Sequence, residues 1–297
     1  MIKKINKMLY DFLWDGKPDQ IKRRTARNKL ENGGIDMIDI ENFDKALKLT
    51  WIRRFLKYDT KWKSVITEIY PNLNEISCFG DNFLKILLRN ISNPFWKNVI
   101  SYYLAFYKKI GITSLEELYE TSFLFNDNIK IKNDIIKNKE FIKKEIFFIK
   151  NLMEDGDFLS FEQFTAKYNI NIDFITYHSI LSSIKKYTCF KNLEDTGIVL
   201  KGQPAIDIIT KTKKGASLIY RKLIDECTID SKGKSKWASV TDISNEDWHN
   251  AFSFLKWTTK DTKLRWLQYR ILHSILTTNR SVSKLKENQR ILDANFR

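Results

Sequence analysis

Residues that interrupt helices or crosslink small folds are scarce in this chain, which has 10 Gly, 4 Pro and 3 Cys among 297 residues. Glycine and proline are the strongest interruptions of secondary structure, so their scarcity leaves room for many long helices. The cysteines, Cys78, Cys189 and Cys227, are odd in number, far apart and outside any C-x-x-C pair. This pattern argues against a disulfide framework and against a zinc knuckle. We therefore expect a reducing compartment, the cytoplasm or the nucleus.

Long apolar runs are also missing. No stretch approaches the roughly 18 apolar residues of a membrane-spanning helix. The first residues do not form a signal peptide, because Asp11 and several lysines interrupt any apolar run. We therefore expect no membrane partner.

Catalytic motifs are absent as well. A polymerase holds two metal ions with paired carboxylates on a tight turn. The sequence contains no aromatic-x-Asp-Asp motif, no phosphate-binding glycine loop, no H-E-x-x-H and no G-x-S-x-G. Asp155 and Asp157 flank Gly156 and could form a metal loop, but an acidic turn that leads into a capped helix explains them more simply. The three histidines are too few and too scattered for a metal site, so we expect no enzymatic activity, no metal ion and no cofactor.

Positive charge, by contrast, is in excess. Lys and Arg number 51 against 36 for Asp and Glu, which gives a formal net charge of +15. Such a surplus favours RNA or DNA as a partner, with an anionic membrane second. The alternative is a soluble protein that is merely rich in lysine, and the clustering of the charges argues against it. With 43% hydrophobic residues and 13% aromatic residues, the composition is that of a folded chain.

Apolar residues recur mostly at helical spacing, which predicts a mainly α protein with many helices. Asn93-Pro94 is typical of a helix start, and Ser160 with Gln163 has the spacing of a capping box. Residues 122–137 are ambiguous. Helices are predicted at 1–14, 61–70, 81–91, 94–110, 138–153, 215–227, 245–257 and 260–277.

A further helix is predicted by an aromatic-rich pattern. Phe43, Leu47, Trp51 and Phe55 recur every four residues. This spacing places them on one side of a helix, which we expect to be its buried stripe.

A β-hairpin is predicted near the N-terminus, over residues 17–40. Asn32-Gly33 supplies the positive φ angles of a tight hairpin turn, and Ile35 to Ile40 reads as a short strand. We divide the chain into four parts: 1–60 (helix, basic hairpin and connecting helix), 61–190 (helical middle domain), 191–214 (linker) and 215–297 (C-terminal helical domain).

The densest positive cluster lies in this predicted hairpin. Residues 17–29, which we call the basic segment, hold six cations in thirteen residues, opposed only by Asp19: Lys17, Lys22, Arg23, Arg24, Arg27 and Lys29. We expect them to contact phosphates, although a solvated edge strand, protected by charge from pairing with other chains, is the alternative. Arg53 and Arg54 follow on the next helix and extend the candidate patch.

A second candidate lies on the predicted helix 260–277. Its core face is predicted to hold Leu264, Leu267, Ile271 and Ile275, and another face to hold Lys263, Trp266, Arg270, His273 and Thr277. A cation beside a flat ring suits a nucleic-acid strand, because phosphates meet the charge and unpaired bases stack on the ring. The alternative is that Trp266 packs against a second helix and that the charges are merely solvated.

Several motifs together resemble one family, the LINE-type (non-LTR) retrotransposon reverse transcriptases. They occur in the family's order and cover nearly the whole chain: Phe12-Leu13-Trp14-Asp15-Gly16-Lys17-Pro18 with Ile21-Lys22-Arg23; Glu31-Asn32-Gly33-Gly34-Ile35; Lys45-Ala46-Leu47-Lys48-Leu49-Thr50-Trp51-Ile52-Arg53-Arg54; Pro94-Phe95-Trp96-Lys97; Gly156-Asp157-Phe158-Leu159-Ser160-Phe161; and Leu267-Gln268-Tyr269-Arg270-Ile271-Leu272-His273 with Thr277-Thr278-Asn279. The resemblance implies a region that follows the polymerase core, with a thumb-like first helix, and that helps to hold template RNA and target DNA. The family's polymerase palm, upstream endonuclease and following zinc knuckle are not in this sequence.

Three functions remain open. The first is a binding module that grips RNA or single-stranded DNA without chemistry. The second is reverse transcriptase activity in this chain, which the missing paired carboxylates argue against. The third is a protein-interaction or structural scaffold, possible partners including the polymerase domain of a parent protein, or a degenerate fragment with no independent activity.

Overall fold

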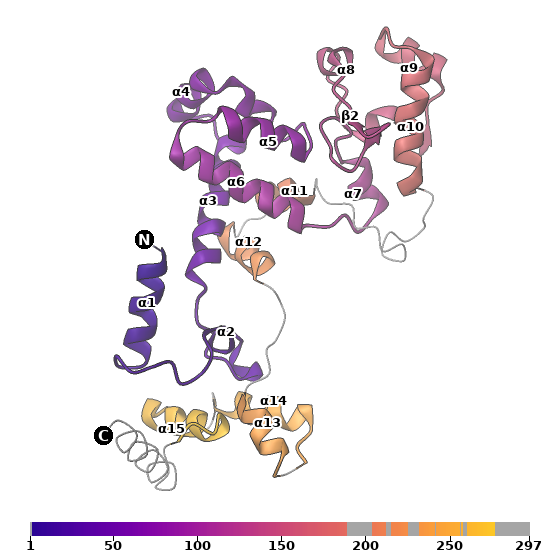
Figure 1. Ribbon diagram of the computed structural model, residues 1–297. Coiled ribbons are helices and arrows are strands. Elements are labelled where there is room, and N and C mark those ends of the chain that lie inside the picture. Colours follow the sequence, from indigo (N-terminus) through magenta and orange to yellow (C-terminus); the bar gives the residue numbers. More distant parts are fainter. Residues whose placement is uncertain are drawn as a thin grey trace, which may run out of the picture. The chain divides into compact units, whose positions relative to one another are not determined.

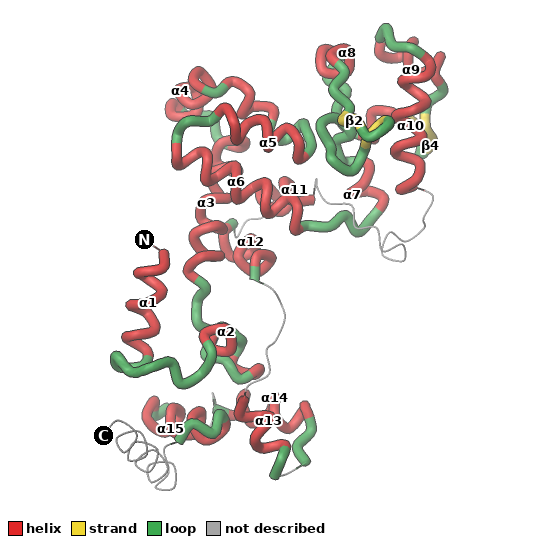
Figure 2. The backbone as a smooth tube through the Cα atoms, in the orientation of Figure 1, coloured by secondary structure: helices red, strands yellow, loops and turns green. Residues whose placement is uncertain are grey.

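The protein is mainly helical, as predicted (Figures 1 and 2). The computed structural model describes residues 2–188, 204–211, 215–224, 232–240, 242–255, 257 and 260–276. Among the described helices, none combines the length and the apolar character that a bilayer span requires.

The chain forms two compact units. Unit 1 comprises Met1–Glu41 with Asp225–Arg297, and unit 2 comprises Asn42–Ile224. These units differ from the four predicted parts, because the two ends of the chain share one hydrophobic core. Within the predicted linker 191–214, residues 204–211 form a helix whose Ala205, Ile206 and Ile209 side chains are buried, and the rest lies outside the described residues.

Unit 1 is built around aromatic side chains. Its described elements are α1 (Ile2–Leu13), α2 (Arg23–Ala26), the 3-10 turn η1 (Leu30–Asn32), α13 (Lys232–Ala238), α14 (Asn245–Phe254) and α15 (Thr262–Leu272). Its buried rings come from both ends of the sequence, with Tyr10 and Trp14 from the first and Trp248, Phe252 and Tyr269 from the second.

The β-hairpin predicted over 17–40 is wrong. In this part of the chain the structure has helix α2 and the turn η1, and no strand among the described residues. Gly33 has the expected positive φ of 75°, but its N–H closes a 3-10 turn onto the Leu30 carbonyl at 2.9 Å. The N–H groups of Ile35 and Met37 both donate to the Ala26 carbonyl, at 3.1 Å each. Within the first half of the expected hairpin, residues 23–26 form α2 instead of a strand, and α2 buries Thr25 and Ala26.

Unit 2 holds most of the described helices. Its elements are α3 (Ile40–Lys57), α4 (Lys61–Ile69), the 3-10 helix η2 (Pro71–Glu75), α5 (Asp81–Asn90), α6 (Pro94–Lys109), α7 (Leu115–Tyr119), β1 (Lys130–Ile131), β2 (Asp134–Ile135), α8 (Lys139–Lys143), the 3-10 helix η3 (Ile149–Leu152), β3 (Met153–Glu154), β4 (Asp157–Phe158), α9 (Phe161–Tyr168), α10 (Phe174–Thr188), α11 (Pro204–Lys211) and α12 (Ala216–Leu223). Two predicted helix starts are confirmed. The Asn93 side chain accepts from the N–H groups of Phe95 and Trp96, and Ser160 forms a capping box with Gln163.

Short antiparallel strand pairs occur only within residues 130–158 of the described chain. β1 pairs with β2 and β3 pairs with β4. Asp155 and Gly156, with φ of 49° and 90°, connect β3 to β4, so the acidic turn prediction is confirmed. The helix predicted over 138–153 is wrong in length. It ends at Lys143, and Glu145 follows with a φ of 56°, which a right-handed helix does not accommodate.

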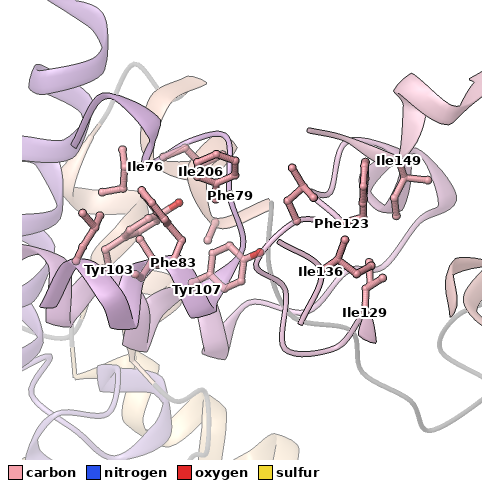
Figure 3. Close-up of a cluster of buried hydrophobic side chains, with 14 of the residues drawn as sticks. Ile76, Phe79, Phe83, Tyr103, Tyr107, Phe123, Ile129, Ile136, Ile149 and Ile206 are labelled. Atoms are coloured by element: carbon pink, nitrogen blue, oxygen red, sulfur yellow. The ribbon is translucent and has the colours of Figure 1, made fainter. Parts of the chain in front are cut away.

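The core of unit 2 joins side chains from distant segments. Figure 3 shows Phe83 of α5, Tyr103 of α6 and Ile206 of α11 in one cluster of buried side chains, which also includes Phe123.

The predicted buried stripe of α3 is displaced from its expected position. Phe43 and Leu47 are 37% and 44% exposed, and Trp51 is only partly buried. The buried residues of α3 are spaced by three and run through Ala46, Leu49, Ile52 and Phe55. Phe55 ends this line against Trp96 of α6, with ring centroids 5.7 Å apart.

Candidate nucleic-acid interface

Two arginines of the basic segment are held by carboxylates and by a ring. Arg23 Nε lies 2.7 Å from Asp19 Oδ2, and its guanidinium carbon lies 4.5 Å from the centroid of the Tyr10 ring. Arg27 Nη1 lies 2.6 Å from Oδ2 of Asp39, a buried residue. Because Arg23 and Arg27 are four residues apart, they share one side of the α2 turn. Arg27, which binds a buried carboxylate, therefore supports the fold of unit 1, and Arg23, although exposed, is engaged by Asp19 and Tyr10.

The basic segment has four other cations, which are exposed as Arg23 is: Lys17, Lys22, Arg24 and Lys29. Lys17 and Lys29 lie near carboxylates at 3.9 Å and 3.7 Å, with side chains 68% and 74% exposed, so water weakens these pairs. The side chains of Lys22 and Arg24 form no ion pair or hydrogen bond with any described residue. Arg24 projects about 100° around the helix from Arg23, away from the Tyr10 ring. Lys22 and Arg24 are therefore free to meet an anion.

The structure reverses the predicted faces of α15. Leu264, Leu267 and Ile271, which were predicted to be core, are 50%, 42% and 39% exposed. Trp266 was predicted to lie on an open basic ribbon, but it is partly buried and stacks on Tyr269, with ring centroids 5.4 Å apart and an interplanar angle of 11°.

Aromatic packing explains this reversal. Trp266 also lies 5.6 Å from the Trp14 ring, and Tyr269 and His273 continue the same side of α15 at spacings of three and four. Large rings bury more apolar area than leucines, so the ring-bearing face takes the core position. Of the predicted ribbon, Lys263 is exposed and Arg270 is half-buried, while Thr277 lies outside the described residues.

His273 is a structural residue of unit 1. Only 2% of it is exposed, and its Nε2 donates to the Gly33 carbonyl at 2.8 Å. The Tyr269 hydroxyl donates to the same carbonyl at 3.2 Å. Burial lowers the pKa of His273, and the hydrogen bond to Gly33 opposes part of that shift. The folded state therefore favours the neutral imidazole.

Unit 1 is expected to lose stability on mild acidification. The pKa of His273 is lower in the folded state than in the unfolded chain, where it is about 6.5. Above about pH 6.5 His273 does not affect the free energy of unfolding. As pH falls below that value, the unfolded chain binds the proton first, and unfolding is increasingly favoured. We expect the free energy of unfolding of unit 1 to fall between neutral pH and pH of about 5.5. His273→Gln can still donate to Gly33 and does not titrate, so its profile should be flatter. Identical profiles for the two proteins, measured by urea unfolding at each pH, would remove His273 as the cause.

The remaining predicted cations, Arg53 and Arg54, belong to α3 in unit 2. Arg54 is exposed, and its guanidinium carbon lies 4.8 Å from the centroid of the Trp51 ring. Arg53 is partly buried, and its Nε has no hydrogen-bond partner among the described residues. Arg54 is therefore the more accessible of the two.

Two residues that organise the basic segment were not predicted. Tyr10 donates to the Arg23 carbonyl at 3.2 Å, and Asp39 binds Arg27 and accepts from the Glu41 N–H at 3.1 Å. An Asp just before a predicted helix is a capping signal, so Asp39 could have been found from sequence. The role of Tyr10 could not have been found from sequence, because it depends on the contact of Tyr10 with Arg23 across the turn that follows α1.

Within the part of the chain that the structure describes, no three His, Cys, Asp or Glu side chains gather closely enough to hold a metal ion. In unit 1, the candidate site consists of the exposed cations of the basic segment, and the core of this unit is rich in aromatic side chains. Comparison with protein families, with curated proteins and with solved structures found no match for this chain.

Proposed function

We propose that this chain holds RNA or DNA, without catalysing a reaction, through the exposed cations of its basic segment. The observation that carries the proposal is that Lys22 and Arg24 are exposed and unpaired among the described residues, in a segment whose other arginines are fixed by Asp19 and Asp39. A net charge of +15 adds long-range attraction for a polyanion. The resemblance to the region after the polymerase core of LINE-type retrotransposon proteins supports the same role.

The unpaired cations and the paired cations have different roles in this proposal. Arg23 and Arg27 shape the segment, and Lys22 and Arg24 bind phosphates. Neutralising a phosphate releases counterions, so affinity should fall steeply as salt rises. RNA and DNA both carry the required phosphates, and the sequence resemblance is compatible with either.

The double variant Lys22→Ala with Arg24→Ala tests this assignment. On duplex DNA each lost phosphate contact removes about 0.9 from the slope of log affinity against log salt, so we expect a reduction of roughly two. Binding is measured by a salt titration, in parallel, with RNA, single-stranded DNA and duplex DNA. Because both side chains are exposed, the free energy of unfolding should be unchanged.

A matched control removes two exposed lysines of unit 2, Lys61→Ala and Lys97→Ala. It lowers the net charge by the same amount and should keep the slope. An equal loss of slope in both variants would contradict a localised site, and an unchanged slope after the loss of Lys22 and Arg24 would exclude the basic segment. A protein that binds no nucleic acid at any salt concentration would favour the structural scaffold. Template-dependent primer extension by this chain alone would overturn the non-catalytic assignment.

A further inference from the structure

A groove in unit 2 has the chemistry of a second phosphate-binding surface. It has a volume of about 550 Å³ and lies between the β1–β2 hairpin and α10, which are in contact. Lys130 and Lys132 of the hairpin line one side, and Ser179, Ser182 and Lys186 of α10 line the other. None of the described lining residues is acidic.

The framework of the groove is fixed by hydrogen bonds. The Ser183 hydroxyl donates to the Lys130 carbonyl at 2.8 Å, and the Tyr187 hydroxyl donates to the Asn128 carbonyl at 2.7 Å. These bonds fasten both ends of the segment that leads into the hairpin onto α10. Since the walls are held before any ligand arrives, little ordering is needed on binding.

The cations of the groove are differently engaged. Lys130 lies 4.0 Å from Asp127, at the limit of an ion pair. Lys132 is exposed at the hairpin turn, where its φ is 50°, and Lys186 is exposed on α10. Neither Lys132 nor Lys186 forms an ion pair with a described residue. Lys186 Nζ lies 4.9 Å from the centroid of the Tyr187 ring, a contact that brings no carboxylate to it, so both ammonium groups are available to an anion.

An exposed ring completes the groove. Phe174, the first residue of α10, is 55% exposed and lines the same space. Its orientation is set by the Phe161 ring, edge-on at 5.4 Å, and by the His178 ring at 4.1 Å. A ring that is held by two neighbouring rings and is still 55% exposed suits stacking by an unpaired base. A lone exposed Phe needs no explanation, but this one lies beside Lys132 and Lys186 and beside the serines of α10 that line the groove.

We propose that this groove binds single-stranded nucleic acid, with phosphates at Lys132 and Lys186 and a base against Phe174. Within a duplex the bases stack on one another, so the Phe174 ring would gain nothing from duplex DNA. The inference rests on the proposed function, to which it adds a second contact surface and a preference for unpaired strands.

The test separates charge from stacking in the full-length chain. Lys132→Ala with Lys186→Ala should reduce the salt slope for an unstructured single strand by roughly 1.4, at about 0.7 per phosphate. Phe174→Ala should weaken binding of the same strand on the order of tenfold, and should leave binding of inorganic polyphosphate unchanged. RNA and DNA strands are titrated in parallel, and Lys61→Ala with Lys97→Ala is again the charge control.

The outcomes distinguish this inference from the proposed function. If the groove variants bind like the wild type while Lys22→Ala with Arg24→Ala loses slope, the groove is excluded and the basic segment stands. If the lysine variant loses affinity but Phe174→Ala binds both the single strand and polyphosphate as well as the wild type does, the site takes phosphate alone and the inference is overturned. If the wild type binds no nucleic acid, both are wrong. All these side chains are exposed or half-exposed, and thermal unfolding confirms that each variant is folded.

Discussion

Gly34→Ala is expected to unfold unit 1 while leaving unit 2 intact. A Cβ atom at Gly34 would lie 1.7 Å from the backbone carbonyl oxygen of Asn28. No side-chain rotation relieves this overlap, because the obstacle is backbone. The only escape is to separate two segments that the hydrogen bonds from Gly34 N–H to Lys29 and from Asp36 N–H to Asn28 hold together, at 3.0 Å and 2.9 Å.

The cost of that separation combines overpacking with broken hydrogen bonds. Forced overpacking costs about 1–3 kcal/mol and each lost bond about 0.5–1.5 kcal/mol, so a destabilisation on the order of 3 kcal/mol or more is expected. Hydrogen exchange should show lost protection in α2, α14 and α15, and native protection in α5, α6 and α10. The two units have separate hydrophobic cores, which is why the effect should be confined to one of them.

Gly16→Ala provides the control for this prediction. Gly16 also has a positive φ, 70°, but nothing lies within 4 Å of the place where its Cβ would be. Its replacement should cost only the left-handed backbone penalty, roughly 1–2 kcal/mol. Equal effects of the two substitutions would show that the close approach of Asn28 and Gly34 does not limit stability.

Local signals predicted several helix starts, although α10, α11 and α13 were not among the predicted helices. Asn93 and Ser160 mark helix starts because a cap depends only on residues within one turn, and both caps form as expected. The positive φ of Gly33 was predicted for the same reason. The structure of the segments on either side of Gly33 was not predicted correctly, because a turn residue does not specify whether those segments pair as strands or fold back onto a helix.

Non-local packing decided the features that the sequence did not predict. On α15 both candidate faces were apolar enough to be buried, and the Trp14 ring, from the other end of the chain, selects the face of Trp266. The groove of unit 2 was missed for a similar reason. Lys132 and Lys186 lie far apart in sequence, so they do not form one cluster along the chain. They share a surface because Ser183 and Tyr187 hold the segment of the hairpin on α10.

Phe164→Ala is expected to have the largest effect in unit 2. Phe164 is fully buried, and its ring stacks on Tyr177 of α10, with centroids 4.7 Å apart and an interplanar angle of 23°. Burial also raises the pKa of the Tyr177 hydroxyl to about 12, and this hydroxyl donates to the Leu159 carbonyl at 2.8 Å. Removing a buried phenyl ring leaves a cavity, and about 3–5 kcal/mol of unfolding free energy should be lost in a urea titration. Phe164→Leu fills most of the space and should lose clearly less.

The same substitution separates support of the groove from direct contact with its ligand. Tyr177 lies on the side of α10 opposite to Ser182 and Lys186, at helical spacings of five and nine residues. Phe164→Ala should therefore weaken binding only as unit 2 starts to unfold, with the two losses following one denaturant curve. Lys132→Ala with Lys186→Ala should weaken binding with no change in that curve. Phe164 is buried beneath α10 and has no exposed surface to offer a ligand, so it is assigned to support alone. If Phe164→Ala weakened binding while unit 2 stayed folded, that assignment would be wrong.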